Sequence, residues 1–479
     1  MNPELKKWCE QAEKIRTESA REYYKLYVGL KYNPNKIHQL ERESLKHSLF
    51  FLKKFKEPKD LISECVGSVA GAKTHKLSLK LEDLRMKKIC SVKHKFKEKP
   101  VCWTSWRTFV VNAPDKARKE VYDEFIKKTP IIAPTIKKTF EKCKKIYFDY
   151  GLNPLTEYLD DHKISLNHLK STLIELREGV RKKYKKEFSH YTEQFLGREP
   201  RYYDDFYFMR NIVFENMTSG FKSINPLAQI NKTLKQLGFN PSKIKVDSTE
   251  RPKKAPSPFC MMAKIPGDIR VSYKMENPLN TTNAIFHEFG HAIHGTSIDP
   301  KLPYWVRYGM SGGLCETFSI FFEKILLNKN YLTKELKLPP DYADEFIRKT
   351  NFTDLYSVAF YTGNSLFKIK YWEKEFSFSE TSEEYAKEIK KSMGLDIPGE
   401  YWMLHHILPE TLIAVPNYML ADMNVAKLQD LFENEFGQEW WKNKKAGKQI
   451  YELMKPGKNS PLGDFSKINP KTFLRRLGC

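Results

Sequence analysis

The stretch NTTNAIFHEFGHAIHG, residues 280–295, organises the interpretation of the whole chain. Its pattern predicts a helix over residues 281–294, and on that helix His287 and His291 are four residues apart, so both imidazoles share one face. Two ring nitrogens placed in this way can meet one metal ion at about 2.0–2.1 Å. Glu288 lies about 100° round the helix, where it can take a proton from a water that the metal has acidified. The spacing therefore predicts metal-assisted hydrolysis, with zinc as the expected ion.

Residues at both ends of this stretch are typical of helix boundaries. Asn280 or Thr281 can cap the start, and Gly295 can end the helix in the left-handed conformation. Gly290 lies inside the helix at a cost of roughly 1 kcal/mol relative to alanine, which predicts close backbone packing there. His294, one turn beyond the second metal-binding histidine, is expected to pack or support, because a fourth protein ligand would close a catalytic zinc site.

Two histidines and a water leave zinc one ligand short, so a third protein ligand is expected downstream. Residues 308–323 read YGMSGGLCETFSIFFE, a glycine-rich loop that leads into an amphipathic helix. Glu316 lies at the start of that helix and is a candidate for the third ligand, with Cys315 as the competing donor. Adjacent helical residues point about 100° apart, so only one of the two can face the metal. Ser319 and Glu323 follow one and two turns later and can support the ligands.

The composition places the chain among globular proteins with more than one lobe. At 479 residues it is too long for a single core, and 41% of the residues are hydrophobic. The N-terminal sequence MNPELKKWCEQAEK has no apolar run, so we expect no signal peptide, and no later stretch is long enough to span a membrane. The cysteines show no paired spacing, which favours reduced thiols in a cytoplasmic protein. They are Cys9, Cys65, Cys90, Cys102, Cys143, Cys260, Cys315 and Cys479.

The formal net charge of +23 raises the question of partners. Lysine-rich patches recur at 137–145, 181–186 and 442–448, and a nucleic-acid surface is one interpretation. No nucleic-acid motif accompanies the charge, so we favour solvated helix faces and expect neither a nucleic-acid nor a membrane partner. Short peptides are the expected partners, and a positive field can attract acidic ones. Monomer and dimer both remain open.

The rest of the chain is mainly helical in pattern. Phe259–Lys264 and Asp268–Lys274 read as two strands joined at Pro266-Gly267, and the strand edge could bind a peptide by strand addition. Residues 243–257 are rich in proline and charge and are expected to form a loop. Helices are expected at 1–47 with a break near Asn33-Pro34, and at 77–99, 115–127, 133–150, 166–191, 340–350, 353–374 and 382–393.

Residues 247–294 and 302–327 resemble the thimet oligopeptidase and oligoendopeptidase F family of zinc metallopeptidases. The shared pattern is a loop rich in proline and basic residues, a Phe-Cys strand, a second strand and then the HExxH helix. By this resemblance, Glu316 falls at the family's glutamate ligand. Tyr418 falls at a tyrosine that hydrogen-bonds the substrate carbonyl, and His406 lies near a substrate-binding histidine. The resemblance also implies two helical lobes around a deep channel that admits oligopeptides.

Some features depart from that family. Residues 406–416 read HILPETLIAVP, without the family's Gly-Gly loop, and its further tyrosines are absent. The spacing from His406 to Tyr418 is also similar to the carboxypeptidase Taq family. That family's His-Glu-Ser-Gln signature is missing, because residues 314–318 read LCETF. These residues favour the oligopeptidase over the carboxypeptidase.

The sequence thus predicts a mainly α-helical protein with a small β-sheet beside the zinc helix. We expect an N-terminal helical lobe over residues 1–200 and a catalytic lobe over 201–479, with the third ligand on a helix at 314–327 and substrate-binding helices near the C-terminus.

The predicted activity is zinc-dependent hydrolysis of short peptides by an oligoendopeptidase. One Zn²⁺ is held by His287, His291 and Glu316, and Glu288 is the general base. The resemblance adds Tyr418 and His406 as donors to the oxyanion. The alternatives are a zinc carboxypeptidase of the Taq type, a nucleic-acid-binding protein with a relict metal site, and a structural zinc protein with four ligands.

Overall fold

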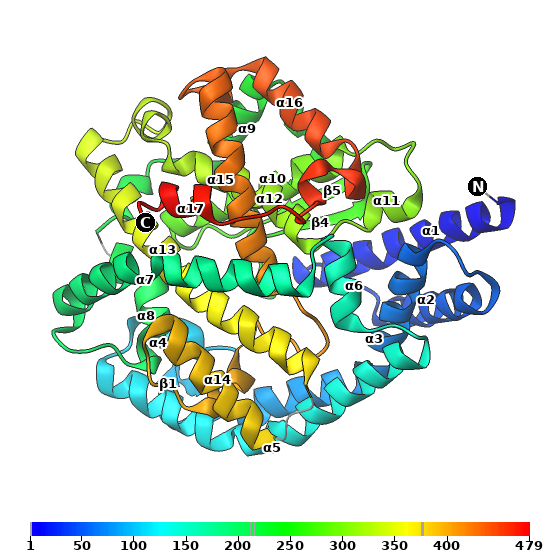
Figure 1. The fold of residues 1–479 in the computed structure, drawn as a ribbon, viewed down its shortest axis with the longest axis horizontal. Helices are drawn as coiled ribbons and strands as arrows, with labels where there is room; N and C mark the ends of the chain where they lie inside the picture. Colours follow the sequence, from blue (N-terminus) through cyan, green and yellow to red (C-terminus); the bar gives the residue numbers. More distant parts are fainter. Residues whose placement is uncertain (1, 211, 215, 375–377, 406) are drawn as a thin grey trace.

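The computed structural model describes residues 2–210, 212–214, 216–374, 378–405 and 407–479. Helices make up most of it (Figure 1), as the sequence predicted. They are α1 (Pro3–Tyr27), α2 (Pro34–Lys54), α3 (Lys59–Lys88), α4 (Trp106–Asn112), α5 (Asp115–Asp149), α6 (Pro154–Asp161), α7 (Leu166–Leu196), α8 (Asp205–Arg210), α9 (Pro226–Leu237), α10 (Pro278–Ser297), α11 (Tyr304–Tyr308), α12 (Gly312–Glu323), α13 (Pro340–Glu373), α14 (Phe378–Met393), α15 (Pro416–Phe436), α16 (Lys444–Met454) and α17 (Lys471–Arg476).

The strands form two small sheets. β1 (Cys90–Phe96) and β2 (Lys99–Cys102) pair as an antiparallel hairpin. The second sheet has the order β3-β5-β4, in which β5 (Asp268–Ser272) is central, with β3 (Ile244–Asp247) parallel to it and β4 (Phe259–Lys264) antiparallel. The two strands predicted before the zinc helix are therefore confirmed, and β4 lies at an edge of its sheet.

Several predicted boundaries are wrong, for reasons visible in the structure. Residues 77–99 are not one helix, because α3 ends at Lys88 and the hairpin follows. Residues 115–149 form a single helix that continues through Pro130 and Pro134, where two helices were expected. The predicted loop at 243–257 contains β3, which pairs with β5 over four residues and so depends on a long-range partner.

Two clusters of buried apolar side chains form the cores of two lobes. One is built mainly on α3, α5, α7, α13 and α14, and the other on the three-stranded sheet, α9, α10, α12 and α16. Figure 1 shows α9, α10, α12 and α16 in the upper half of the molecule and α5 and α14 in the lower half. Both clusters combine segments from before and after residue 200, and the predicted division of the chain there stays a prediction.

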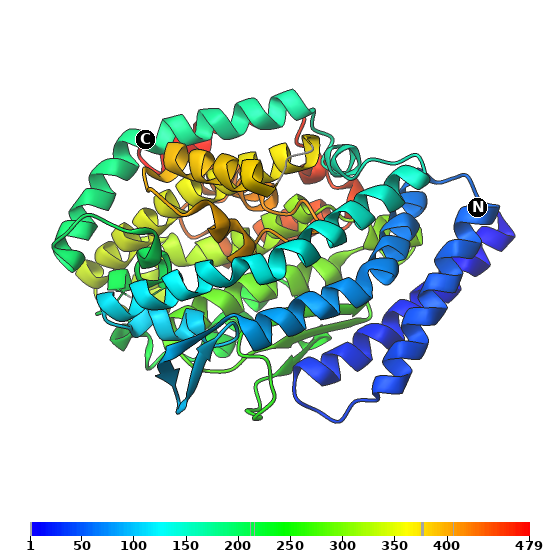
Figure 2. The same cartoon turned by 90° about the horizontal axis from the view of Figure 1, so that it is seen from below.

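The N-terminal helices α1 and α2, dark blue in Figure 2, form a hairpin along one side of the molecule. Asn33 caps α2 by accepting a hydrogen bond from the backbone N–H of Lys36, which places the break between the two helices where the sequence predicted it. One face of α1 packs on β4, where Phe259 contacts the rings of Tyr24 and Tyr27. The hairpin therefore lies beside the edge strand of the sheet.

The expectation that all cysteines are reduced is wrong for one pair. Cys90 and Cys102 oppose each other in the β1–β2 hairpin and form a disulfide. Their spacing of 12 residues becomes a pairing only through the hairpin, which the helical interpretation of residues 77–99 concealed. The other six cysteines are free. No helix within the described ranges has both the length and the apolar character needed to cross a membrane.

Candidate metal centre

The helix that carries the two histidines, α10, begins earlier than predicted. The Asn277 side chain accepts a hydrogen bond from the backbone N–H of Asn280 at 3.0 Å, and Pro278 occupies the first turn. An asparagine cap satisfies an exposed N–H, and proline at the first helical position has a φ already suited to the helix. This pair therefore provides the cap, and the prediction of Asn280 or Thr281 is wrong by about one turn.

The end of α10 also differs from the prediction. Gly295 is helical, and the helix continues to Ser297. A Cβ added at Gly295 would lie 3.0 Å from both Cδ1 of Ile269 and Sδ of Met262. The glycine therefore lets the helix pack against β4 and β5, and does not end the helix in the left-handed conformation.

Gly290 brings α10 close to the helix that carries the third ligand. A Cβ at this position would lie 2.6 Å from the backbone oxygen of Phe318 and 2.6 Å from Cα of Ser319, both on α12. Real Cβ contacts are essentially never so short. The predicted close backbone packing at Gly290 is confirmed, and it fixes the separation between the histidines and Glu316.

His287, His291 and Glu316 come together with their ligand atoms all within 4.8 Å of one another. The Oε2 atom of Glu316 lies 3.4 Å from Nε2 of His287 and 3.7 Å from Nε2 of His291. A tetrahedral ion with bonds of about 2.0–2.2 Å holds neighbouring donors roughly 3.4 Å apart. The spacing and the two-nitrogen, one-oxygen donor set therefore fit a zinc ion with an open fourth position.

Two further side chains on α12 orient these ligands. Oε2 of Glu323 lies 2.9 Å from Nδ1 of His287, on the opposite side of the ring from the ligand nitrogen. The Ser319 hydroxyl donates to Oε2 of Glu316 at 3.0 Å. Partners of this kind fix the tautomer and the direction of a metal ligand. Both residues lie where the helical spacing placed supporting groups.

Cys315 does not belong to the metal cluster found among the described residues. Burial, followed by the charge of Glu316, raises the pKa of its thiol to about 12, so it stays protonated near neutral pH. Its backbone instead hydrogen-bonds His291. Of the two neighbours that competed for the metal, Glu316 is the one that faces the histidines.

Glu288 lies beside the cluster and next to the edge strand. Burial raises the pKa of its carboxyl above the usual value, although the neighbouring His287 opposes the shift. The backbone of Cys260 on β4 hydrogen-bonds this carboxyl. A carboxylate with a raised pKa is a stronger base than an ordinary glutamate and is better matched to proton transfer near neutral pH.

Tyr418, on the first turn of α15, lies near the same carboxylates. Its ring packs against Tyr361 with centroids 5.0 Å apart. Burial raises the pKa of its hydroxyl to about 12, with smaller contributions from the charges of Glu316 and Glu288. The phenol is therefore protonated near neutral pH and within electrostatic reach of both carboxylates.

The remaining predicted histidines have different positions. His406 lies outside the described residues, so its role stays a prediction. His405 is buried, with its ring 4.4 Å from that of Tyr401. His294 is also buried, 4.4 Å from the ring of Phe318, and neither of its nitrogens has a partner in the described part of the chain. Burial lowers the pKa of His294 to about 3, so it packs as a neutral ring and not as a ligand.

A half-buried charge cluster behind the ligands was not predicted from the sequence. Lys324 directly follows Glu323, the partner of His287. Its Nζ lies 2.6 Å from Oδ2 of Asp354 on α13. Asp422 lines the same small cavity, and burial raises its pKa to about 8 despite the nearby Lys324. The position of Asp422 one turn after Tyr418 could have indicated its side of α15. Asp354 has no such sequence signal, because α13 reaches the site only through the fold.

Comparisons with known proteins find the same segment. A family model described as carboxypeptidase Taq (M32) metallopeptidase matches residues 211–371, which contain the three-residue cluster and Glu288. Among solved structures, "Trypanosoma Cruzi Metallocarboxypeptidase 1" is similar with a TM-score of 0.52, covering 98% of each chain at 15% sequence identity. At that identity, the structural similarity shows the fold alone. No curated protein matches the chain in sequence.

The family match and the cluster together support a metallopeptidase with two histidine ligands and one glutamate ligand. The comparisons do not single out the thimet oligopeptidase and oligoendopeptidase F family. They support the carboxypeptidase alternative better than the oligoendopeptidase that the sequence analysis favoured.

Proposed function

We propose that this protein is a zinc-dependent carboxypeptidase that removes residues from the C-terminal end of peptides. The observation that carries the proposal is the position of His287, His291, Glu316 and Glu288 inside the segment that matches the carboxypeptidase Taq model. The family is similar over about a third of the chain, so its activity is transferred here as a proposal.

The donor set supports zinc as the metal. Two imidazole nitrogens and one carboxylate are a usual set in catalytic zinc sites, which keep one position open. The described residues provide three donors to the cluster, which argues against a closed structural site with four ligands. When bound, the ion polarises the scissile carbonyl and lowers the pKa of a water molecule.

The protein's own groups then move the protons and hold the charge. The Glu288 carboxylate takes a proton from the attacking water and passes it to the leaving amine, while the Cys260 backbone fixes its orientation. The Tyr418 hydroxyl donates a hydrogen bond to the oxygen that gains negative charge, since the raised pKa of the phenol keeps it protonated. Glu323 and Ser319 hold two of the ligands in place.

The edge of β4 supports binding of an extended peptide. β4 pairs with β5 on one side and lies at the edge of its sheet. The contact between its Cys260 backbone and Glu288 places this edge next to the reacting groups. A peptide that adds to the sheet there would present its backbone to the metal.

The proposal is tested with zinc-loaded protein and two peptides that differ only in a free or amidated C-terminus. A carboxypeptidase releases single residues in sequence from the free form and leaves the amidated form uncut, as mass spectrometry would show. Internal cleavage of both forms would instead establish the oligoendopeptidase, which is the second candidate because of the resemblance at Tyr418. The variant E288Q is the control, because it should bind zinc but cut neither peptide.

A further inference from the structure

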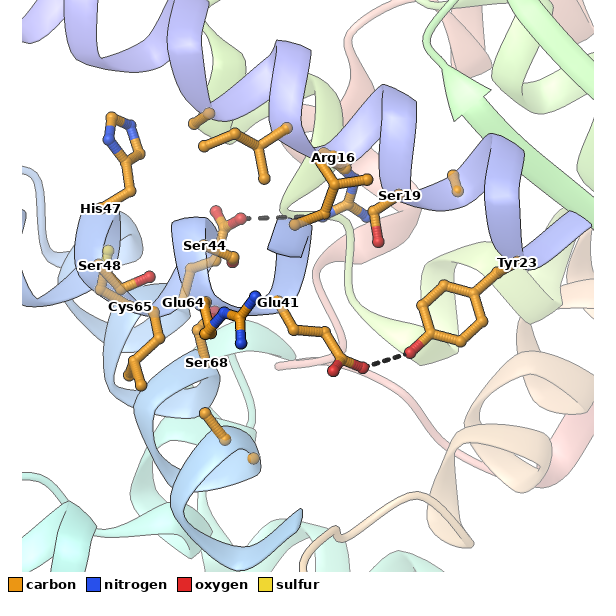
Figure 3. A pocket seen from close by; sticks show the side chains of 18 of the residues that line it. Arg16, Ser19, Tyr23, Glu41, Ser44, His47, Ser48, Glu64, Cys65 and Ser68 are labelled. Carbon is orange, nitrogen blue, oxygen red and sulfur yellow. Dashed lines mark hydrogen bonds and ion pairs between the residues drawn. The ribbon is translucent and has the colours of Figure 1, made fainter. Parts of the chain in front are cut away.

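A cavity of about 910 Å³ separates the N-terminal helices from the edge of the sheet. Its walls come from α1, α2 and α3, and its floor includes Cys260, Met261 and Met262 of β4. Figure 3 shows side chains from all three helices meeting around it, among them Arg16 and Tyr23 from α1. This volume lies in the range of peptide- and ligand-sized sites.

The cavity borders the site described above at Cys260. Cys260 lines it and also provides the backbone contact to Glu288. In a carboxypeptidase only one residue follows the scissile bond, so nearly all of the substrate lies on the N-terminal side of that bond. A peptide on the edge of β4 therefore has this cavity available for residues before the scissile bond.

The carboxylates in the cavity already have hydrogen-bond donors. Glu41 accepts a hydrogen bond from the Tyr23 hydroxyl at 2.5 Å, and Glu64 accepts one from the Tyr304 hydroxyl at 2.7 Å. His38 is a further neighbour of Glu41 at 3.4 Å. The negative groups of the cavity are therefore at least partly satisfied within the protein.

Two arginines that are exposed to solvent, Arg16 and Arg42, also line the cavity and have fewer protein partners. Arg16 reaches Glu64 only at 3.8 Å, beyond hydrogen-bond distance (Figure 3). It hydrogen-bonds the Tyr304 hydroxyl, and its guanidinium carbon lies 4.7 Å from the centroid of the Tyr308 ring. Arg42 also lines the cavity and has no hydrogen bond or ion pair within the described ranges. Each guanidinium has five N–H donors in a planar fork that matches a carboxylate.

We propose that this cavity selects substrates with an acidic side chain before the scissile bond, and that Arg16 and Arg42 provide the selection. The inference rests on the proposed peptidase function and adds a substrate class to it. Arginine binds a carboxylate through two parallel hydrogen bonds, which a neutral amide of the same shape cannot replace. The net charge of +23 acts in the same direction, because a positive field concentrates acidic peptides near the protein.

The test uses peptides with a single Glu, Gln or Lys at each of the second to fifth positions before the scissile bond. We expect kcat/KM for Glu to exceed that for Gln by about three- to tenfold at one position, mainly through KM, which is the scale of partly exposed ion pairs. The advantage should decrease as ionic strength rises. A preference for Lys, or equal rates at all positions, would overturn the inference.

Matched variants separate the cavity from the overall charge. R16Q and R42Q should each reduce the ratio of Glu to Gln rates and leave the rate on the Gln peptide unchanged. R181Q removes the same charge from an exposed arginine on α7 that pairs with Glu178, outside the cavity lining, and should leave the ratio unchanged. An equal loss in R181Q would show that the preference comes from net charge and not from the cavity.

Binding to zinc-loaded E288Q, followed by calorimetry, distinguishes the inference from the proposed function. Tighter binding of the Glu peptide, lost in R16Q or R42Q added to this background, would support the inference even if no peptide is cleaved by the wild-type protein. Turnover of all peptides without a charge preference would retain the proposed function and refute the inference.

Discussion

Substitution of Gly290, where α10 contacts α12, tests most directly how the fold sets the distances between the metal ligands. In G290A the new Cβ would lie 2.6 Å from backbone atoms of Phe318 and Ser319. Backbone atoms cannot rotate away as a side chain can, so the helices must separate by about 1 Å to reach an ordinary carbon contact of ~3.5–4.0 Å. The histidines lie on one of these helices and Glu316 on the other.

Two opposing effects determine the stability of G290A. In a helix interior, alanine stabilises the folded protein by roughly 1 kcal/mol relative to glycine. Overpacking costs about 1–3 kcal/mol, so the metal-free variant should be less stable by about 0–2 kcal/mol. Zinc affinity should decrease more clearly, because donor distances in metal sites tolerate only about 0.2 Å. We expect a loss of at least about 10–100-fold, the usual effect of a lost supporting contact.

Two other helical glycines provide matched controls. The nearest atoms to a Cβ at Gly295 belong to the Ile269 and Met262 side chains and not to backbone, and a Cβ at Gly71 on α3 meets nothing within 4 Å. The thermal stability of the metal-free proteins should therefore rank G71A above G295A and G295A above G290A. Zinc affinity, measured by competition with a chelating indicator, should decrease in G290A and stay unchanged in G71A. Wild-type affinity in a folded G290A would refute the argument that this contact sets the ligand spacing.

Four further predictions concern the side chains of the site. E288Q should retain zinc, measured by metal analysis after dialysis, and lose turnover by about 10²–10⁴, the usual contribution of a general base; near-normal turnover would exclude that role. E316A should lose zinc on dialysis while C315A keeps it, and the reverse pattern would make Cys315 the ligand. E323Q should weaken zinc binding by about 10–100-fold, because the amide is a weaker partner for His287; unchanged affinity would show the contact to be incidental. Y418F should lower kcat and kcat/KM together by about 10²–10³ with KM little changed, whereas a purely structural tyrosine would lower the melting temperature and leave kcat unchanged.

The parts of the fold that could be predicted have local causes. The break between α1 and α2 follows from Asn33 and Pro34, and the strands before α10 follow from short apolar segments joined by Pro266-Gly267. The parts that were missed depend on distant partners. β3 is a strand because it pairs with β5, and α5 continues through Pro130 and Pro134 because its apolar face is buried along its length.

The candidate site shows the same division between local and distant information. His287, Glu288 and His291 lie within five residues on one helix, so their geometry follows from helical periodicity alone. The glycine-rich loop and the helix after it left Glu316 and Cys315 as competing ligands, and the family resemblance favoured Glu316. Asp354 and Asp422 come from two other helices, and the packing of α15 against α12 and of α13 against α15 brings them to Lys324.

The choice between the two modes of cleavage was drawn from residues 314–318, and the structure explains why these residues carry little information about it. Leu314 and Phe318 are almost completely buried in α12, whereas Cys315 is half-buried. Of this segment, Glu316 is the residue whose side chain reaches the metal cluster. Differences at Leu314, Thr317 and Phe318 therefore record how α12 packs and not what the substrate touches. A requirement for a free C-terminal carboxylate depends on groups just beyond the scissile bond, so residues 314–318 could not settle whether the enzyme needs one.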